Sequence, residues 1–157
     1  MGSPRASRPK FAGSRSSRPT KARGLVPWEW AVEQLEVPRN YWLATTRADG
    51  SPHVMPLWGA WLDGVLYFDA HPDSQKVRNL RHQPRGVVHL ESGGEVVIFE
   101  GSVDVEEETS RRGSCSSGSP PCTSRSNRPF RAFGFRAQIG DAWRAAFTGS
   151  ATRFAFE

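Results

Sequence analysis

The spacing of apolar residues changes once along this chain, from a helical period to a strand-like period. Within residues 28–35 apolar side chains recur at helical spacing, and Glu29 places a negative charge in the first turn, where the helix dipole favours it. Pro38 ends this pattern. From Asn40 onward the period is two, which predicts a β-rich body after one short helix.

Turn signals divide this body into five predicted strands. Asp63-Gly64 is a typical two-residue hairpin turn, and residues 48–51 and 92–94 are Gly- and Ser-containing turns. A second helix is predicted over residues 73–82, between the third and fourth strands. The predicted strands are residues 40–47, 52–61, 65–69, 86–91 and 95–106. This order predicts a mainly β fold with few helices, an antiparallel barrel rather than a sandwich.

The second predicted strand is apolar on both faces. One face carries His53, Met55, Leu57, Gly59 and Trp61, and the other carries Val54, Pro56, Trp58 and Ala60. One face can fill the barrel interior, but the other then needs a partner chain, a helix or a ligand to cover it. Pro56 has no N–H to donate to a ladder, which favours an edge or a bulge there, and Gly59 lets another group approach the backbone closely.

The start of the second predicted helix has the composition of an anion site. Asp73 or Ser74 caps the helix, Lys76 lies in its first turn, and Arg78 and Asn79 follow within one more turn. A helix N-terminus carries free N–H groups and a positive dipole, so it suits a phosphate. The alternative is an ordinary solvated helix start, and these residues alone leave both interpretations open.

The positive charge of the chain belongs to its N-terminal segment. Residues 1–24 contain seven Lys or Arg and no Asp or Glu, which leaves 14 basic residues of 21 and all 16 acidic residues elsewhere. Residues 1–26 are rich in Ser, Arg, Pro and Gly, and we predict a disordered basic tail. Because Phe11 is its one aromatic residue, a disordered leader or a misassigned start codon is favoured over nucleic-acid binding, and no specific nucleic-acid partner is expected.

We expect a cytoplasmic protein without a membrane segment. The sequence has no apolar run of about eighteen residues and no apolar segment after its N-terminal basic residues, so neither a transmembrane helix nor a secretory signal is expected. Cys115 and Cys122 lie in Ser/Pro/Gly-rich sequence, and we interpret them as unpaired thiols of a reducing compartment.

Four short motifs give the chain a family resemblance. They are Trp42-Leu43-Ala44-Thr45, residues 49–58 (Asp-Gly-Ser-Pro-His-Val-Met-Pro-Leu-Trp), Leu66-Tyr67-Phe68 and residues 74–80 (Ser-Gln-Lys-Val-Arg-Asn-Leu). Their order and spacing resemble the pyridoxamine 5′-phosphate oxidase-like split-barrel family, and within it the small actinobacterial members that use FMN or a deazaflavin. The resemblance covers about residues 41–106 and the closing segments 142–144 and 149–154.

This resemblance implies a split β-barrel that forms a homodimer, with FMN or a deazaflavin (coenzyme F-420) at the dimer interface. The second copy would cover the doubly apolar strand. The cofactor ring would lie along the backbone of Met55, Pro56, Leu57 and Trp58. The ring or its ribityl chain would contact Phe68 and Asp69. The phosphate would be held by Ser74, Gln75 and Lys76, with Arg78 and Asn79 as further candidates.

Two departures from the family pattern leave the cofactor open between FMN and a deazaflavin. Many members carry an arginine on the second strand at or near the position of Met55, and Gln75 replaces the arginine of the Ser-Arg-Lys phosphate motif. A Lys/Arg-Asn-Leu helix start is instead common among deazaflavin-using relatives. The C-terminal segment that supplies the substrate arginine and histidine of true pyridoxamine-phosphate oxidases is not present, so that activity is not expected.

The resemblance implies an oxidoreductase that transfers two electrons from the reduced cofactor to an unknown small substrate. In such enzymes the protein mainly positions and tunes the cofactor, so no residue is assigned as catalytic. The alternative is a non-catalytic cofactor- or haem-binding split barrel, or an inactive, degenerate member of the family.

The character of the sequence shifts after residues 27–108, the expected split-barrel cofactor-binding domain. Residues 109–129 are rich in Ser, Arg, Gly, Pro and Cys and are predicted to be disordered or aberrant. Relatives usually have a helix and a strand here, so we hypothesise that residues 109–141 are a frameshifted or degenerate stretch of a GC-rich gene. Residues 130–157 are expected to close the barrel, with residues 151–156 as a closing strand.

Overall fold

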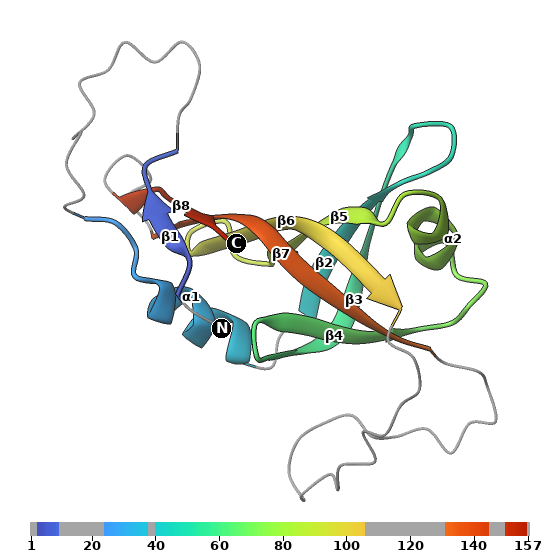
Figure 1. The fold of residues 1–157 in the computed structure, drawn as a ribbon, viewed down its shortest axis with the longest axis horizontal. Helices are drawn as coiled ribbons and strands as arrows, with labels where there is room; N and C mark the ends of the chain where they lie inside the picture. Colours follow the sequence, from blue (N-terminus) through green and yellow to red (C-terminus); the bar gives the residue numbers. More distant parts are fainter. Residues whose placement is uncertain (1–2, 10–23, 38–39, 106–130, 145–149, 157) are drawn as a thin grey trace, which may run out of the picture.

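Six antiparallel strands close into a split barrel (Figure 1). The computed structural model describes residues 3–9, 24–37, 40–105, 131–144 and 150–156. The strands follow one another around the barrel as β7-β4-β3-β2-β5-β6, and β6 pairs back with β7. They are β2 (Asn40–Thr46), β3 (Pro52–Leu62), β4 (Val65–Ala70), β5 (Arg85–Leu90), β6 (Val96–Val105) and β7 (Arg131–Trp143). The mainly β barrel and the five strands expected from the period-two pattern are confirmed.

Helices α1 and α2 lie at opposite ends of the barrel (Figure 1). Helix α1 (Trp28–Glu36) buries Trp30, Ala31 and Leu35 against one end, and of these the helical spacing predicted Ala31 and Leu35 but not Trp30. Helix α2 (Gln75–His82) follows β4 at the other end. In the part of the chain that the structure describes, no helix is both long enough and apolar enough to cross a membrane.

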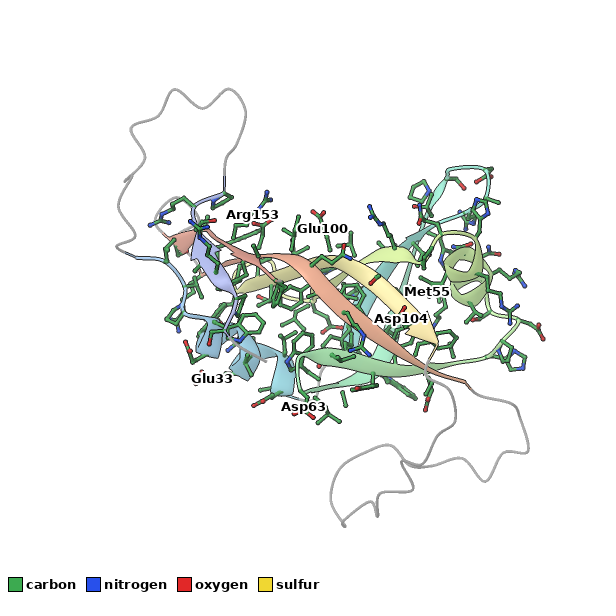
Figure 2. The ribbon with its side chains drawn as sticks, in the orientation of Figure 1. Glu33, Met55, Asp63, Glu100, Asp104 and Arg153 are labelled. Atoms are coloured by element: carbon green, nitrogen blue, oxygen red, sulfur yellow. The ribbon has the colours of Figure 1, made fainter. Side chains whose placement is uncertain are left out.

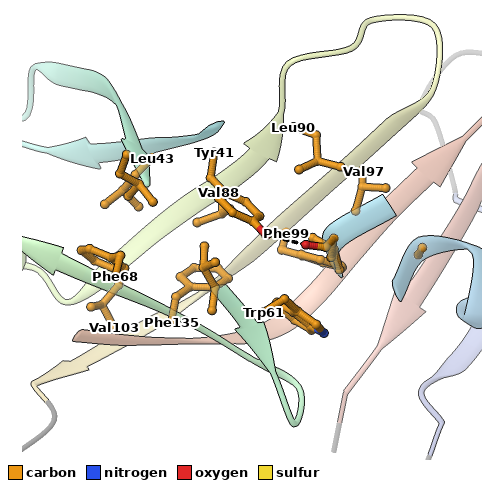
Figure 3. Close-up of a cluster of buried hydrophobic side chains, with 14 of the residues drawn as sticks. Tyr41, Leu43, Trp61, Phe68, Val88, Leu90, Val97, Phe99, Val103 and Phe135 are labelled. Atoms are coloured by element: carbon orange, nitrogen blue, oxygen red, sulfur yellow. Dashed lines mark hydrogen bonds between the residues drawn. The ribbon is translucent and has the colours of Figure 1, made fainter. Parts of the chain in front are cut away.

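Side chains that point inward from the barrel strands fill the barrel interior (Figure 2), as the pleat of a strand allows. Figure 3 shows the resulting cluster, in which Tyr41 and Leu43 come from β2 and Phe135 comes from β7. Trp61 stacks on Phe99 with 5.5 Å between ring centroids. Each such side chain contributes about 1.5–3 kcal/mol by leaving water, so this cluster is the main source of stability.

Strand β3 changes neighbours along its length, and this change splits the barrel. Its first part, Pro52 to Trp58, pairs with β2, whereas only its last part, Gly59 to Leu62, pairs with β4. The two strands are joined by the expected hairpin turn, in which Asp63 has a φ of 52° and Gly64 a φ of 82°. One backbone edge of β3 therefore has no β4 partner before Gly59.

The N-terminal segment contains a strand that the sequence did not predict. Arg5–Ser7 form β1, which pairs with β8 (Thr152–Ala155) on the outer side of β7. The buried Val26 also donates its N–H to Thr152 Oγ1 at 2.7 Å. The prediction of disorder is wrong for these residues, because their hydrogen-bond partners lie at the far end of the chain. Residues 1–2 and 10–23 of the predicted tail lie outside the described residues.

The strand that closes the barrel is β7, which lies within the segment 130–157 expected to close it, whereas the expected closing strand 151–156 contains β8, which pairs with β7 and β1 instead. β7 pairs with β6, β4 and β8, and its Phe133 and Phe135 are buried in the core. The frameshift hypothesis for residues 109–141 is therefore wrong for 131–141, which fit the barrel in register. Residues 109–130 of that hypothesis, including both cysteines, lie outside the described residues.

Candidate functional site

The start of α2 holds a buried hydroxyl without a hydrogen-bond partner. Ser74 is the extended N-cap residue, and its side chain makes no capping hydrogen bond. Its Oγ is buried and has no partner among the described residues. Buried hydroxyls are normally paired, so this one is suited to bind a ligand oxygen. The first-turn N–H groups of α2 add free donors at the same place.

Lys76 adds a positive charge in the first turn of α2. Its side chain is half-buried, and burial lowers the pKa of its ammonium below the ordinary lysine value. Within the described ranges no hydrogen bond or ion pair compensates this ammonium. A half-buried cation is costly unless it is paired, so an anionic group beside Lys76 would relieve that cost.

A directional chain of hydrogen bonds ties α2 to the barrel. Arg78 Nη2 donates to Gln75 Oε1 at 2.8 Å, and Gln75 Nε2 donates to Asn79 Oδ1 at 2.7 Å. Asn79 Nδ2 then donates to Thr45 Oγ1 of β2 at 2.9 Å. Both Asn79 and Thr45 are buried. In the described structure Gln75, Arg78 and Asn79 therefore hold the helix start in place, and only Arg78 among them is exposed.

Two further basic side chains, Arg47 and His53, lie near this corner, and the sequence did not assign them to a site. Arg47 Nη1 donates to the carbonyl oxygen of Pro52 at 2.9 Å, which fixes its guanidinium at the β2–β3 turn. Burial and the charges of Arg47 and Lys76 together lower the pKa of His53 below its ordinary value. The strand pattern placed His53 beside Met55 on one face of β3, but no local signal indicated that Lys76 would come near it.

The predicted ring-binding segment lies on the open part of β3. Met55, labelled in Figure 2, lies toward the α2 end of the barrel, whereas Asp63 marks the other end of β3. Met55 is 43% exposed and Trp58 is 75% exposed, while the side chain of Leu57 is buried in the core. Pro56 also lies in this segment, where the missing β4 neighbour leaves one backbone edge open, as expected for a strand proline.

Phe68 and Asp69 differ in their access to a ligand. Phe68 is buried and stacks on Phe133, with ring centroids 5.4 Å apart. Asp69 is exposed and pairs with Ala132 of β7 rather than with β3. The structure therefore gathers Ser74, Lys76 and the Met55 end of β3 at the α2 end of the barrel, but it places the Phe68 side chain in the core.

Comparisons with known proteins find a matching family model and solved structures with the same fold. The sequence model described as pyridoxamine 5′-phosphate oxidase matches residues 28–143. No curated protein matches the sequence.

Solved structures with this fold cover most of the chain. A conserved hypothetical protein from Mycobacterium tuberculosis has a TM-score of 0.67 and 24% identity, over 80% of this chain and 89% of that one. An F420 reductase has a TM-score of 0.52 and 24% identity, over 69% and 93% of the two chains. An FMN-binding protein from Nostoc punctiforme, related to pyridoxamine 5′-phosphate oxidase, has a TM-score of 0.55 and 14% identity, over 85% and 98%. At these identities the likenesses show the fold alone.

Proposed function

This chain belongs to the pyridoxamine 5′-phosphate oxidase family, and we propose that it is an oxidoreductase that uses FMN or the deazaflavin coenzyme F-420. Its substrate would be a small molecule. The observation that carries this proposal is the pair of unsatisfied groups at the start of α2. Ser74 Oγ is buried without a partner, and Lys76 is half-buried without a counter-ion among the described residues. Both cofactors carry a phosphate group that matches these donors.

The cofactor ring would lie against the open part of β3. An unpaired strand edge offers backbone N–H and C=O groups, which suit the polar edge of a flavin or deazaflavin. The segment Met55 to Trp58 supplies this edge, and the exposed Met55 and Trp58 side chains supply apolar contact area. Among the solved neighbours, an F420 reductase supports the deazaflavin and an FMN-binding protein supports FMN, so we leave the choice between the two cofactors to experiment.

A second copy of the chain would cover the outer face of β3 and complete the site. The strand register places Pro56 beside Trp42, Trp42 beside His89, and His89 beside Ile98 on this face. Trp42 and His89 stack at 6.3 Å across β2 and β5. We name the apolar surface formed by these four residues with Val54 and Trp58 the outer β face. A largely apolar, partly exposed surface that crosses four strands is typical of a protein interface, and this one adjoins the proposed ring site.

Bound flavin or deazaflavin would supply two-electron transfer to the substrate. The residues of the chain would bind and orient the cofactor. Lys76 and the α2 N-terminus neutralise the phosphate, and the chain from Arg78 to Thr45 keeps that helix start fixed on β2. The apolar side chains of β3 exclude water from the ring face. No residue is proposed to move a proton in the transfer itself.

Cofactor binding is the first test. The purified chain is titrated with FMN and, separately, with coenzyme F-420, following cofactor fluorescence. Riboflavin serves as the control, since it carries the same ring as FMN without the phosphate. We expect one cofactor to bind, and riboflavin to bind at least tenfold more weakly than FMN if FMN is that cofactor. If neither cofactor binds, the site assignment fails. Binding without turnover of any electron acceptor would contradict the oxidoreductase activity alone.

A further inference from the structure

The hydrogen-bond chain that begins at Arg78 ends at a histidine. Thr45 Oγ1 accepts a hydrogen bond from Asn79, so its own hydrogen is free to be donated. Two acceptors lie 3.4 Å from it, His53 Nδ1 and the His53 carbonyl oxygen. When the hydroxyl donates to Nδ1, the neutral imidazole carries its hydrogen on Nε2.

The same contacts are also compatible with a protonated His53. A hydroxyl oxygen has two acceptor lone pairs, so Thr45 Oγ1 can accept from Asn79 and from a protonated Nδ1 at the same time. Its hydrogen would then turn to the His53 carbonyl oxygen. The rotation of one hydroxyl therefore satisfies the site in both charge states of the imidazole, without any change in the strands.

The charges around His53 favour an anion. From β2 and the turn that follows it come Arg47 and Asp49, and from α2 comes Lys76. The Asp49 carboxylate accepts hydrogen bonds from Ser51, and the charges that act on His53 are those of Arg47 and Lys76. Both are positive, and with burial they lower the pKa of the imidazole. A dianion placed among these groups would reverse that effect, because an opposite charge stabilises the protonated ring.

We propose that His53 is a third residue of the anion site beside Ser74 and Lys76, and that it binds the phosphate group of the ligand in its protonated form. The inference rests on the proposed function, since that function places a phosphate at the start of α2. The proton comes from solvent, so each binding event takes up at most one proton, at pH values between the pKa of the free imidazole and its raised pKa in the complex. Ligand affinity, at constant ligand charge, therefore rises as pH falls through this range.

Inorganic sulfate is the probe, because it keeps two negative charges throughout the titration of histidine. The full chain, labelled in its histidine rings, is titrated by NMR between about pH 5 and 8, with sulfate or with chloride at equal ionic strength. The spectrum of His53→Gln assigns the His53 signals, and the exposed His82 at the other end of α2 is the internal reference. We expect sulfate to raise the His53 midpoint by about one pH unit and to leave His82 unchanged.

A second readout uses thermal stability. Sulfate should raise the Tm of the wild-type chain and of the control His82→Gln more at about pH 6 than at about pH 8, whereas His53→Gln should show equal shifts at the two pH values. If sulfate raises the Tm but the titration midpoint of His53 is the same in sulfate as in chloride, the inference fails and the proposed function stands. If neither FMN nor coenzyme F-420 binds while sulfate still moves the midpoint, the proposed function fails and His53 remains an anion-binding residue.

Discussion

The carbonyl oxygen of Tyr67 lies 2.7 Å from the position that a Cβ atom on Gly59 would occupy. This close approach marks the first pair of β3 and β4, Gly59 with Phe68. A side chain at residue 59 would push the two strands apart where the barrel begins to open. Gly59 therefore allows β4 to approach β3 closely at the end of the open segment of β3. The group that approaches the Gly59 backbone is β4 itself.

Gly59→Ala should lower the free energy of unfolding by about 1–3 kcal/mol, because the added methyl group overlaps the backbone of β4. Gly93→Ala is the matched control, since its Cβ would meet no atom within 4 Å, and it should change stability by less than about 0.5 kcal/mol. Urea denaturation of both variants gives the comparison. Equal stability of the two variants would show that β4 can shift without cost.

Asn79→Ala should destabilise the protein by about 1–3 kcal/mol, because it leaves Thr45 and Gln75 without their buried partner. Arg81→Ala, on the exposed side of the same helix, should have little effect. A double-mutant cycle with Thr45→Val should show a coupling of at least about 0.5 kcal/mol. Additive effects of the two substitutions would argue against a connected network.

The barrel strands could be predicted because their period-two pattern is local. The sequence also identified β3 as apolar on both faces, and the exposure of Val54 and Trp58 in the structure confirms this. Strand β1 could not be predicted, because three residues carry no pattern and their pairing with β8 is long-range. The sequence predicted that residues 130–157 close the barrel but did not identify β7 as the closing strand, since the place of that strand depends on its pairing with β4 and β6.

The candidate site likewise depends on long-range packing that local sequence patterns do not reveal. Sequence spacing grouped Arg78 and Asn79 with Lys76 at one helix start, and the family resemblance added Gln75 to this group. Which of them turn toward the barrel depends on how α2 packs on β2, and that packing rests on the bond between Asn79 and Thr45. The proximity of His53 to Lys76 likewise arises only after β3 pairs with β2.

Trp58→Asp should weaken self-association of the chain by at least about 2 kcal/mol, if the outer β face is the dimer interface. Trp58 is 75% exposed, so the substitution removes little core packing, and the stability of the monomer should change little. Sedimentation equilibrium measures the dissociation constant. Gln83→Asp, which adds the same charge in the exposed link after α2, is the control and should dimerise as the wild type does. A wild-type chain that stays monomeric at all concentrations would contradict the proposed interface.

Lys76→Met should weaken binding of the phosphate-bearing cofactor by about 1.5–3 kcal/mol, because a charge-assisted hydrogen bond is lost while the aliphatic packing of the side chain is kept. The same substitution should raise the stability of the cofactor-free protein by up to about 1 kcal/mol. The sign follows from the lowered pKa of Lys76, since the fold disfavours its charged form. Raising the pH toward the ordinary lysine pKa removes the penalty in the wild type, so the gain in stability should shrink at alkaline pH.

The control for Lys76→Met is Arg81→Met, which removes a cation from the exposed last turn of the same helix. It changes the net charge equally, so any loss of affinity caused by long-range electrostatics alone should appear in both variants. Fluorescence titration and urea denaturation, each performed on both variants, separate binding from stability. An equal loss of affinity in the two variants would remove Lys76 from the site. If the ammonium is unpaired and half-buried, its removal should stabilise the cofactor-free chain. A loss of both stability and affinity in Lys76→Met would therefore show that Lys76 supports the fold rather than the ligand.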